Sequence, residues 1–312
     1  MAARRKKPGP GSIALGVVMI TLIRGFFAFA RLIGPNRSAD LGGFLARTLG
    51  PFMPVHRKAI TNLKAAYPEK SEREIRQLAL GAWDNLGRTA FEYPHLDQLI
   101  DYDPDDPRPD RRVEVSGVEH FLSLRDDGRP AIIFSAHLAN WELPAIIAQR
   151  YGLDTTAVFR APNDLVAARV VAEIRGKTMG GLEASRPGMV FALQGILERG
   201  GHVGALIDQH LSRGVVTPFM GRPALTNPLL AKLARRFDCP VHGARVIRLP
   251  GHRFRIELTP PLDLPRDAEG RIDVTGAMTA MTAVVESWVR EYPEQWLWMH
   301  RRWRPIPADR AA

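Results

Sequence analysis

Short unbroken apolar runs alternate with helically spaced apolar rows through most of the second half of the chain. Residues 131–134 are four consecutive apolar residues, which is typical of a strand buried on both faces. The pattern predicts strands at 112–117, 130–136, 155–160, 202–208, 241–249 and 254–259, and helices at 143–152, 163–179, 187–200, 229–238 and 274–291. This alternation predicts an α/β domain with a mainly parallel central sheet that helices cover on both faces.

A purely helical pattern precedes this region. From residue 39 to about residue 99, apolar residues recur every three or four positions, as they do along amphipathic helices. Pro68 interrupts the pattern, and Ser71 with Glu74 forms a capping box that begins the next helix. The stretch 101–112 is rich in Asp and Pro, which indicates an exposed connector. We therefore divide the chain into 1–35, a helical segment and connector at 36–110, and an α/β domain at 111–312.

The first 35 residues combine a basic start with an apolar run. Four cations at 4–7 precede apolar residues 13–23, and the apolar stretch then continues to residue 33 with Arg24 and Arg31 inside it. A cleaved signal peptide, a transmembrane helix and an interfacial helix all remain open from this pattern. Because cations flank the run on both sides and arginines lie within it, we favour a membrane anchor on the cytoplasmic face.

Charge and cysteine content narrow the possible functions. The formal net charge is +10, from 43 Lys and Arg against 33 Asp and Glu, which suggests an anionic partner; a general bias of the sequence towards Arg is the alternative. The single cysteine, Cys239, cannot form an internal disulfide and lies among apolar residues, so we expect a buried, non-catalytic thiol. No metal-ligand spacing and no nucleic-acid motif is present, so we expect no metal, no cofactor and no nucleic-acid partner.

The main candidate for chemistry is a histidine just beyond the most apolar strand. His137 follows residues 131–134, at the sheet edge where α/β proteins place their ligands, and Glu142 lies five residues later. With His137 in a turn and Glu142 in the first turn of a helix, the two side chains could meet. A carboxylate on one imidazole nitrogen would make the other nitrogen a general base for a substrate hydroxyl. The alternative is a structural histidine, with Glu142 only supporting the helix start.

The motif "HLANWE" resembles the H-x4-D/E motif of the lysophospholipid acyltransferase superfamily and, more narrowly, the "HFGNWE" form of the bacterial lipid A late acyltransferases. Four further blocks resemble that family in the same order: "NLKAAYPEKSEREI", "VFRAPND", "IDQHLSRGVVTPFMGRPA" and "PEQWLWMHRRWRP". The resemblance covers about residues 56–305 and implies a glycerol-phosphate-acyltransferase-like fold with N-terminal membrane-associated helices. Leu138 and Ala139 depart from the common Phe-Gly.

The resemblance implies transfer of a fatty acyl chain from acyl carrier protein to a hydroxyl of a lipid A precursor, at the cytoplasmic face of the bacterial inner membrane. His137 would be the base, Glu142 would orient it, and no acyl-enzyme would form. The other candidate residues are expected to bind the oxyanion or the phosphorylated substrate: Arg160, Asp208, Gln209, Arg213 and Arg222. Because the strands that precede them end at one sheet edge, Arg160 and Asp208 are expected near His137.

Two alternatives stay open. One is an acyltransferase of the same superfamily that acts on another glycolipid or on a lysolipid. The other is a basic, membrane-attached module that binds an anionic ligand. The cluster of Trp296, Trp298 and Trp303 with neighbouring arginines would suit a membrane headgroup layer or, alternatively, a packed core.

Overall fold

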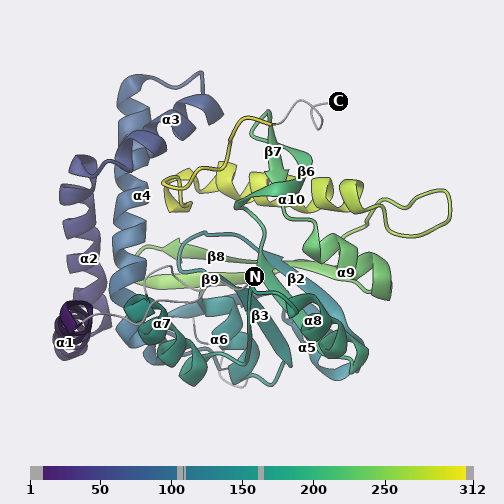
Figure 1. Cartoon of the computed structure of the whole chain (residues 1–312), viewed down its shortest axis with the longest axis horizontal. Coiled ribbons are helices and arrows are strands. Elements are labelled where there is room, and N and C mark those ends of the chain that lie inside the picture. The colour runs from purple at the N-terminus through teal and green to yellow at the C-terminus, as the bar shows by residue number, and fades with distance from the viewer. Residues whose placement is uncertain (1–9, 104–107, 109, 161–164, 307–312) are drawn as a thin grey trace.

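A seven-stranded sheet forms the centre of the molecule (Figure 1). The computed structural model describes residues 10–103, 108, 110–160 and 165–306. The strand order is β1-β9-β8-β2-β5-β3-β4, and every neighbouring pair is parallel except β8 with β9. The bounds are β1 Val113–Ser116, β2 Ala131–Ser135, β3 Thr155–Phe159, β4 Gly181–Ala184, β5 His202–Leu206, β8 Val241–Leu249 and β9 Arg253–Leu258. A separate antiparallel hairpin consists of β6 His210–Phe219 and β7 Arg222–Thr226.

Helices cover both faces of the sheet. The even-numbered residues of β2, Ile132 and Phe134, are fully buried in a core shared with α8 Met189–Glu198, α9 Leu229–Phe237 and α10 Val274–Glu291. The opposite face packs against α5 Val118–Asp126, α6 Leu143–Arg150 and α7 Leu165–Thr178. The prediction of a mixed α/β fold with a mainly parallel, helix-flanked sheet is confirmed.

The N-terminal helices stand beside the sheet (Figure 1). They are α1 Pro10–Ile33, α2 Pro35–Leu49, α3 His56–Ala66 and α4 Glu72–Glu92, with short 3-10 helices η1 Gly50–Phe52 and η2 Tyr93–Gln98. The capping box at Ser71 and Glu74 is present as predicted. The helices α2 and α4 meet at glycines, because a Cβ on Gly87 would lie 2.1 Å from the carbonyl oxygen of Gly42.

Within the described residues, no helix combines the length and apolarity needed to cross a bilayer. The basic residues 4–7 and part of the connector, 104–107 and 109, lie outside the described residues.

The sequence analysis did not predict α5, β4 or the β6–β7 hairpin. The hairpin carries exposed Ser, Arg and Pro residues rather than a regular apolar alternation, because it is not part of the main sheet.

Candidate active site

His137 and Asp208 lie side by side because the strands before them are neighbours. Strand β2 ends two residues before His137, and β5 ends two residues before Asp208. The two strands are parallel, with Ser135 opposite Leu206. Both side chains therefore emerge at the carboxyl edge of the sheet, where open α/β sheets bind ligands.

The Asp208 carboxylate holds His137 at two points. One oxygen, Oδ1, lies 2.8 Å from His137 Nδ1, and the other, Oδ2, accepts the His137 backbone N–H at 2.8 Å. Burial alone would raise the pKa of Asp208, but the charge and hydrogen bonds of His137 outweigh it and hold this pKa well below its usual value. The ionised carboxylate fixes the tautomer with the proton on Nδ1, which leaves a lone pair on His137 Nε2.

The C-terminal segment completes this arrangement. Trp296 donates its indole N–H to Asp208 Oδ2 at 2.7 Å, and the backbone N–H of Leu297 donates to the carbonyl of His137 at 3.2 Å. Both Trp296 and Trp298 are fully buried. Of the two expectations for this cluster, the packed core is therefore correct for Trp296 and Trp298, and the headgroup layer is wrong for them, because their rings pack against each other within the main hydrophobic core.

Glu142 has other partners than the expected one. Its carboxylate accepts hydrogen bonds from the Nε and Nη2 atoms of Arg175, from the Tyr93 hydroxyl at 2.6 Å and from the Trp141 indole at 3.1 Å. The structure thus corrects the expected pairing of Glu142 with His137: the carboxylate bound to the imidazole is that of Asp208. Glu142 immediately precedes α6, and its side chain is only 4% exposed. Because a buried carboxylate is costly without a counter-charge, the ion pair with Arg175 of α7 is what allows Glu142 to be buried.

Burial and the nearby charge of Glu142 raise the pKa of Tyr93 well above its usual value, so this hydroxyl stays a donor. Trp141 contacts both Glu142 and His137: its indole N–H donates to Glu142, and its ring centroid is 5.1 Å from that of His137.

A buried polar network fixes the turn that carries His137. Asn140 donates to Glu92 on α4 at 2.9 Å, and Glu92 is paired with Arg248 of β8. Ala139 adopts a left-handed conformation with φ of 46°, and its carbonyl accepts the Thr89 hydroxyl at 2.9 Å. The departure from the family's glycine therefore falls at a backbone position that favours glycine.

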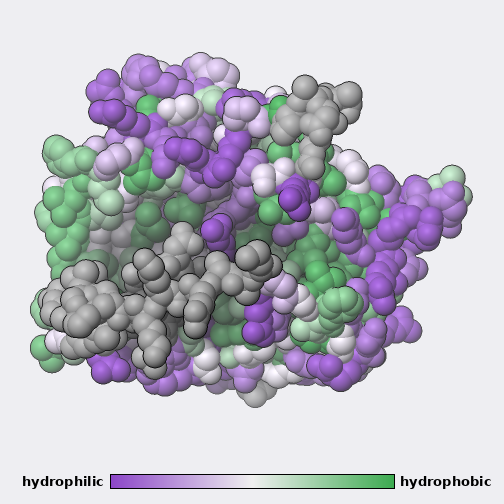
Figure 2. Space-filling model, viewed as in Figure 1, coloured by the Kyte–Doolittle hydropathy of each residue, from purple (hydrophilic) through white to green (hydrophobic). Residues whose placement is uncertain are grey.

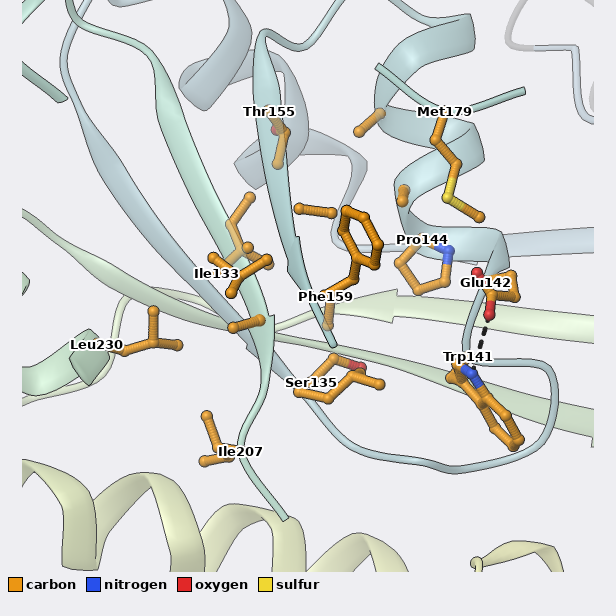
Figure 3. Close-up of a pocket in the computed structure, with 18 of the residues that line it drawn as sticks. Ile133, Ser135, Trp141, Glu142, Pro144, Thr155, Phe159, Met179, Ile207 and Leu230 are labelled. Atoms are coloured by element: carbon orange, nitrogen blue, oxygen red, sulfur yellow. Dashed lines mark hydrogen bonds between the residues drawn. The ribbon is translucent and has the colours of Figure 1, made fainter. Parts of the chain in front are cut away.

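An apolar cavity of about 520 Å³ opens beside His137 on the sheet face covered by α5, α6 and α7. Figure 3 shows Phe159, Ile133 and Pro144 facing this space, with Thr155 at one end and Trp141 and Glu142 at the other. Beyond Ile133, the side chains of Leu124, Ala131, Ala148 and Leu153 form a closed apolar cluster. A cavity lined mainly by apolar side chains that opens beside the His137 imidazole suits the alkyl chain of a ligand whose polar head lies at His137.

The remaining candidates divide into two groups. Gln209 and Arg160 line the cavity with His137, and the side-chain Nε2 of Gln209 lies 3.2 Å from His137 Nε2. Arg160 follows β3, which is separated from β2 by β5, so Arg160 is one strand further from His137 than expected. The exposed Arg213 and Arg222 lie on the hairpin and do not line this cavity; Arg222 stacks on Trp303 at 5.2 Å.

The single cysteine lies apart from this site. Cys239 is buried outside the cavity, and burial raises its thiol pKa to about 11. Among the described residues, no group of three or more His, Cys, Asp or Glu side chains could hold a metal ion.

Comparison with known proteins identifies the family. A model of the family described as bacterial lipid A biosynthesis acyltransferase matches residues 10–305. The chain belongs to this family. A lipid A biosynthesis myristoyltransferase of Escherichia coli (strain K12) is 27% identical over 271 residues, which cover 84% of this chain and 78% of the relative.

Two further acyltransferases are similarly related to the chain. Lipid A biosynthesis acyltransferase 1 of Shigella flexneri is 26% identical, with 84% of this chain and 78% of the relative covered. A lipid A biosynthesis lauroyltransferase of E. coli (strain K12) is 28% identical over 278 residues, which cover 81% of this chain and 79% of the relative.

In this lipid A acyltransferase family member, the sequence analysis did not assign Arg175 or the buried Arg302 to the site, and it named Trp296 only as part of a tryptophan cluster. Arg302 donates to Thr226 Oγ1 at 2.7 Å and to the Leu225 carbonyl at 3.2 Å, and burial lowers its pKa to about 10. Trp296 and Arg302 stand within the C-terminal block that resembles the family, so that block carried a signal for both. For Arg175 no such signal was present.

Proposed function

We propose that this protein transfers a fatty acyl chain from acyl carrier protein to a hydroxyl group of a lipid A precursor, with His137 as the general base. The observation that carries the proposal is the His137–Asp208 pair at the mouth of a large apolar cavity. Membership of the family supports an acyl transfer in lipid A biosynthesis.

The proposed reaction begins with the lone pair on His137 Nε2. The amide of Gln209 donates to this atom, and the acceptor hydroxyl takes its place when the substrate binds. His137 removes the hydroxyl proton as the oxygen attacks the thioester carbonyl carbon. The carbon–sulfur bond then breaks, and the imidazolium returns the proton to the departing thiolate. Because the substrate supplies the nucleophile, no acyl-enzyme forms.

Asp208 rather than Glu142 is the positioning residue in this proposal. Its charge stabilises the imidazolium that forms during the reaction, and its two hydrogen bonds hold the ring towards the cavity. Glu142 joins the turn that carries His137 to α7 through Arg175 and to η2 through Tyr93.

Cationic side chains have two further proposed roles. Arg160 lines the cavity mouth and would stabilise the oxyanion of the tetrahedral intermediate. Arg213 and Arg222 are exposed on the hairpin and would contact the phosphates of the acceptor or the acidic surface of acyl carrier protein.

Exposed apolar side chains support attachment to the cytoplasmic face of the inner membrane. Leu32, Phe44 and Phe52 are 84%, 65% and 85% exposed. Figure 2 shows hydrophobic surface along α2, at the left of the view. The exposed Arg37, Arg47 and Arg57 accompany this surface, and cations beside apolar groups suit an anionic bilayer. Binding to vesicles of anionic phospholipid should fall when Phe44 and Phe52 are both replaced by serine.

The proposed reaction is tested by mass spectrometry of the acceptor. Detergent-solubilised protein is mixed with acylated carrier protein and an under-acylated Kdo-lipid A, and one added acyl group is expected. In His137→Ala the rate should fall by about 10²–10⁴-fold, as loss of a general base does. Lys232→Gln is the folded control, because Lys232 is exposed on α9 and does not line the cavity. Transfer to a different glycolipid or lysolipid instead would reject the acceptor. Equal rates for wild type and His137→Ala would reject the base.

A further inference from the structure

One of the glycines in the strands has room beside it for a larger side chain. Four glycines lie in described strands: Gly181, Gly204, Gly214 and Gly243. At Gly181, Gly214 and Gly243, an added Cβ would come within 2.2, 2.3 and 2.8 Å of other atoms, so close packing requires glycine there. On Gly204, a Cβ would lie 3.5 Å from Thr155 Cγ2 and 3.8 Å from the Ile133 carbonyl oxygen, which are ordinary contact distances.

Neither backbone conformation nor packing explains Gly204. Its φ is not positive, and it sits inside β5, between β2 and β3, where glycine weakens a strand. A glycine kept in a strand interior without either reason often marks a place where a ligand approaches the backbone closely.

The ligand space at Gly204 is the apolar cavity itself. Gly204 lines this cavity, and so do its register partners Ile133 on β2 and Ala157 on β3. Val203, its neighbour in the chain, is buried in the core of the other face, so position 204 faces the cavity. Ile133 precedes His137 by four residues, so Gly204 lies about 13 Å along the strands from the base. An alkyl chain that begins at His137 and enters the cavity passes over this position.

We propose that Gly204 sets the length of acyl chain that the enzyme accepts, by leaving the sheet face bare at the depth that only longer chains reach. This inference rests on the proposed acyl transfer. Adding one methyl group at position 204 narrows the cavity there without moving the backbone. Acyl chains too short to reach position 204 should bind this variant as well as they bind the wild type, whereas longer chains should bind it less well. Ala157 on the neighbouring strand limits the same space from the side.

The test measures kcat/KM for acyl transfer from carrier protein bearing decanoyl, lauroyl, myristoyl or palmitoyl chains. For Gly204→Ala, the ratio of longest to shortest accepted donor should fall by roughly tenfold, the usual discrimination for one methylene in an apolar pocket. Ala157→Gly should shift the preference towards longer donors, and the double variant should return towards the wild-type profile. Gly195→Ala on α8 is the matched control, because it makes the same change outside the cavity with only Arg199 Nη1 near, at 3.6 Å.

A second measurement separates this inference from the proposed reaction. Thermal melting without ligand should show Gly204→Ala at least as stable as wild type, because alanine is favoured over glycine in a strand interior. Melting with free fatty acids of the same lengths should show selective loss of stabilisation by the longer ones. An equal change for every donor and every fatty acid would overturn the role of Gly204. If wild type transfers no acyl group while the melting shifts remain length-dependent, the proposed reaction fails and the role of Gly204 as a chain-length limit stands.

Discussion

Two buried carboxylates flank the turn that carries His137, and they use their charge differently. Asp208 is 2% exposed and binds the imidazole and backbone N–H of His137. Glu142 is 4% exposed and binds Arg175, Tyr93 and Trp141. Equal burial therefore does not mean equal function. A carboxylate bound to an imidazole fixes the tautomer and orientation of that ring, whereas one bound to an arginine mainly joins two parts of the fold.

The largest expected effect is on catalysis by Asp208→Asn. Removing this charge leaves the imidazolium without its partner and allows the wrong tautomer, so kcat should fall by about 10³-fold. Steady-state kinetics with a saturating donor measure this effect. The assignment of the two carboxylates would be reversed if Glu142→Gln lowered kcat as much as Asp208→Asn while its unfolding free energy stayed at the wild-type value.

The second expected effect is on stability. Glu142→Gln keeps acceptors for Tyr93 and Trp141 but leaves the Arg175 guanidinium, 15% exposed, without its counter-charge. Breaking a buried ion pair from one side costs about 3 kcal/mol of unfolding free energy. Urea denaturation followed by circular dichroism measures it. The double variant Glu142→Gln with Arg175→Gln should recover part of the loss; a double variant as unstable as the sum of two single variants would contradict this coupling.

The pH dependence of the unfolding free energy should report on Asp208. The pKa of Asp208 is lower in the folded protein than in the unfolded chain, where an Asp side chain has a pKa of about 3.9. Its stabilisation is therefore complete above about pH 4 and is lost as pH falls further towards the folded-state pKa. Unfolding free energies measured from about pH 6 down to pH 3 should fall less steeply at the acid end for Asp208→Asn than for wild type. Parallel curves would show that Asp208 contributes nothing to this acid limb.

The smallest effect is expected in the turn between the two carboxylates. Ala139→Gly relieves a left-handed φ of 46° but removes a methyl group that is fully buried. These terms are each about 1 kcal/mol and opposite in sign, so unfolding free energy should change by less than about 1 kcal/mol. A loss of several kcal/mol in denaturant titration would mean that the alanine methyl group, not backbone strain, dominates at this position.

Local patterns predicted much of the sheet. Every predicted strand corresponds to an observed one, because each is either a short apolar run, as in β2, or an alternation of apolar and polar residues, as in β1 and β9. Strand order was not accessible in this way. We expected both Arg160 and Asp208 near His137 because the strands before them end at one sheet edge. The strand β5 lies between β2 and β3, so Asp208 is directly beside His137 and Arg160 is one strand further away. Order in a sheet depends on long-range pairing, which no local window of sequence contains.

The side chains that contact one another in the site also could not be paired from local sequence. His137 could be found from its place after an apolar strand and from its motif. Trp296 is 88 residues from Asp208, and Arg175 is 33 residues from Glu142. Periodicity detects contacts three or four residues apart, so neither pair leaves a periodic signal.

The contact between Trp296 and Asp208 has a consequence for how the protein becomes active during its synthesis. All seven strands of the sheet precede residue 259, so the sheet can form while the rest of the chain is still on the ribosome. The indole that fixes Asp208 and the backbone N–H that binds the His137 carbonyl are made only after the whole sheet. His137 and Asp208 can therefore come together on the nascent sheet first, and they should be held in their final geometry only once residues 296 and 297 have left the ribosome.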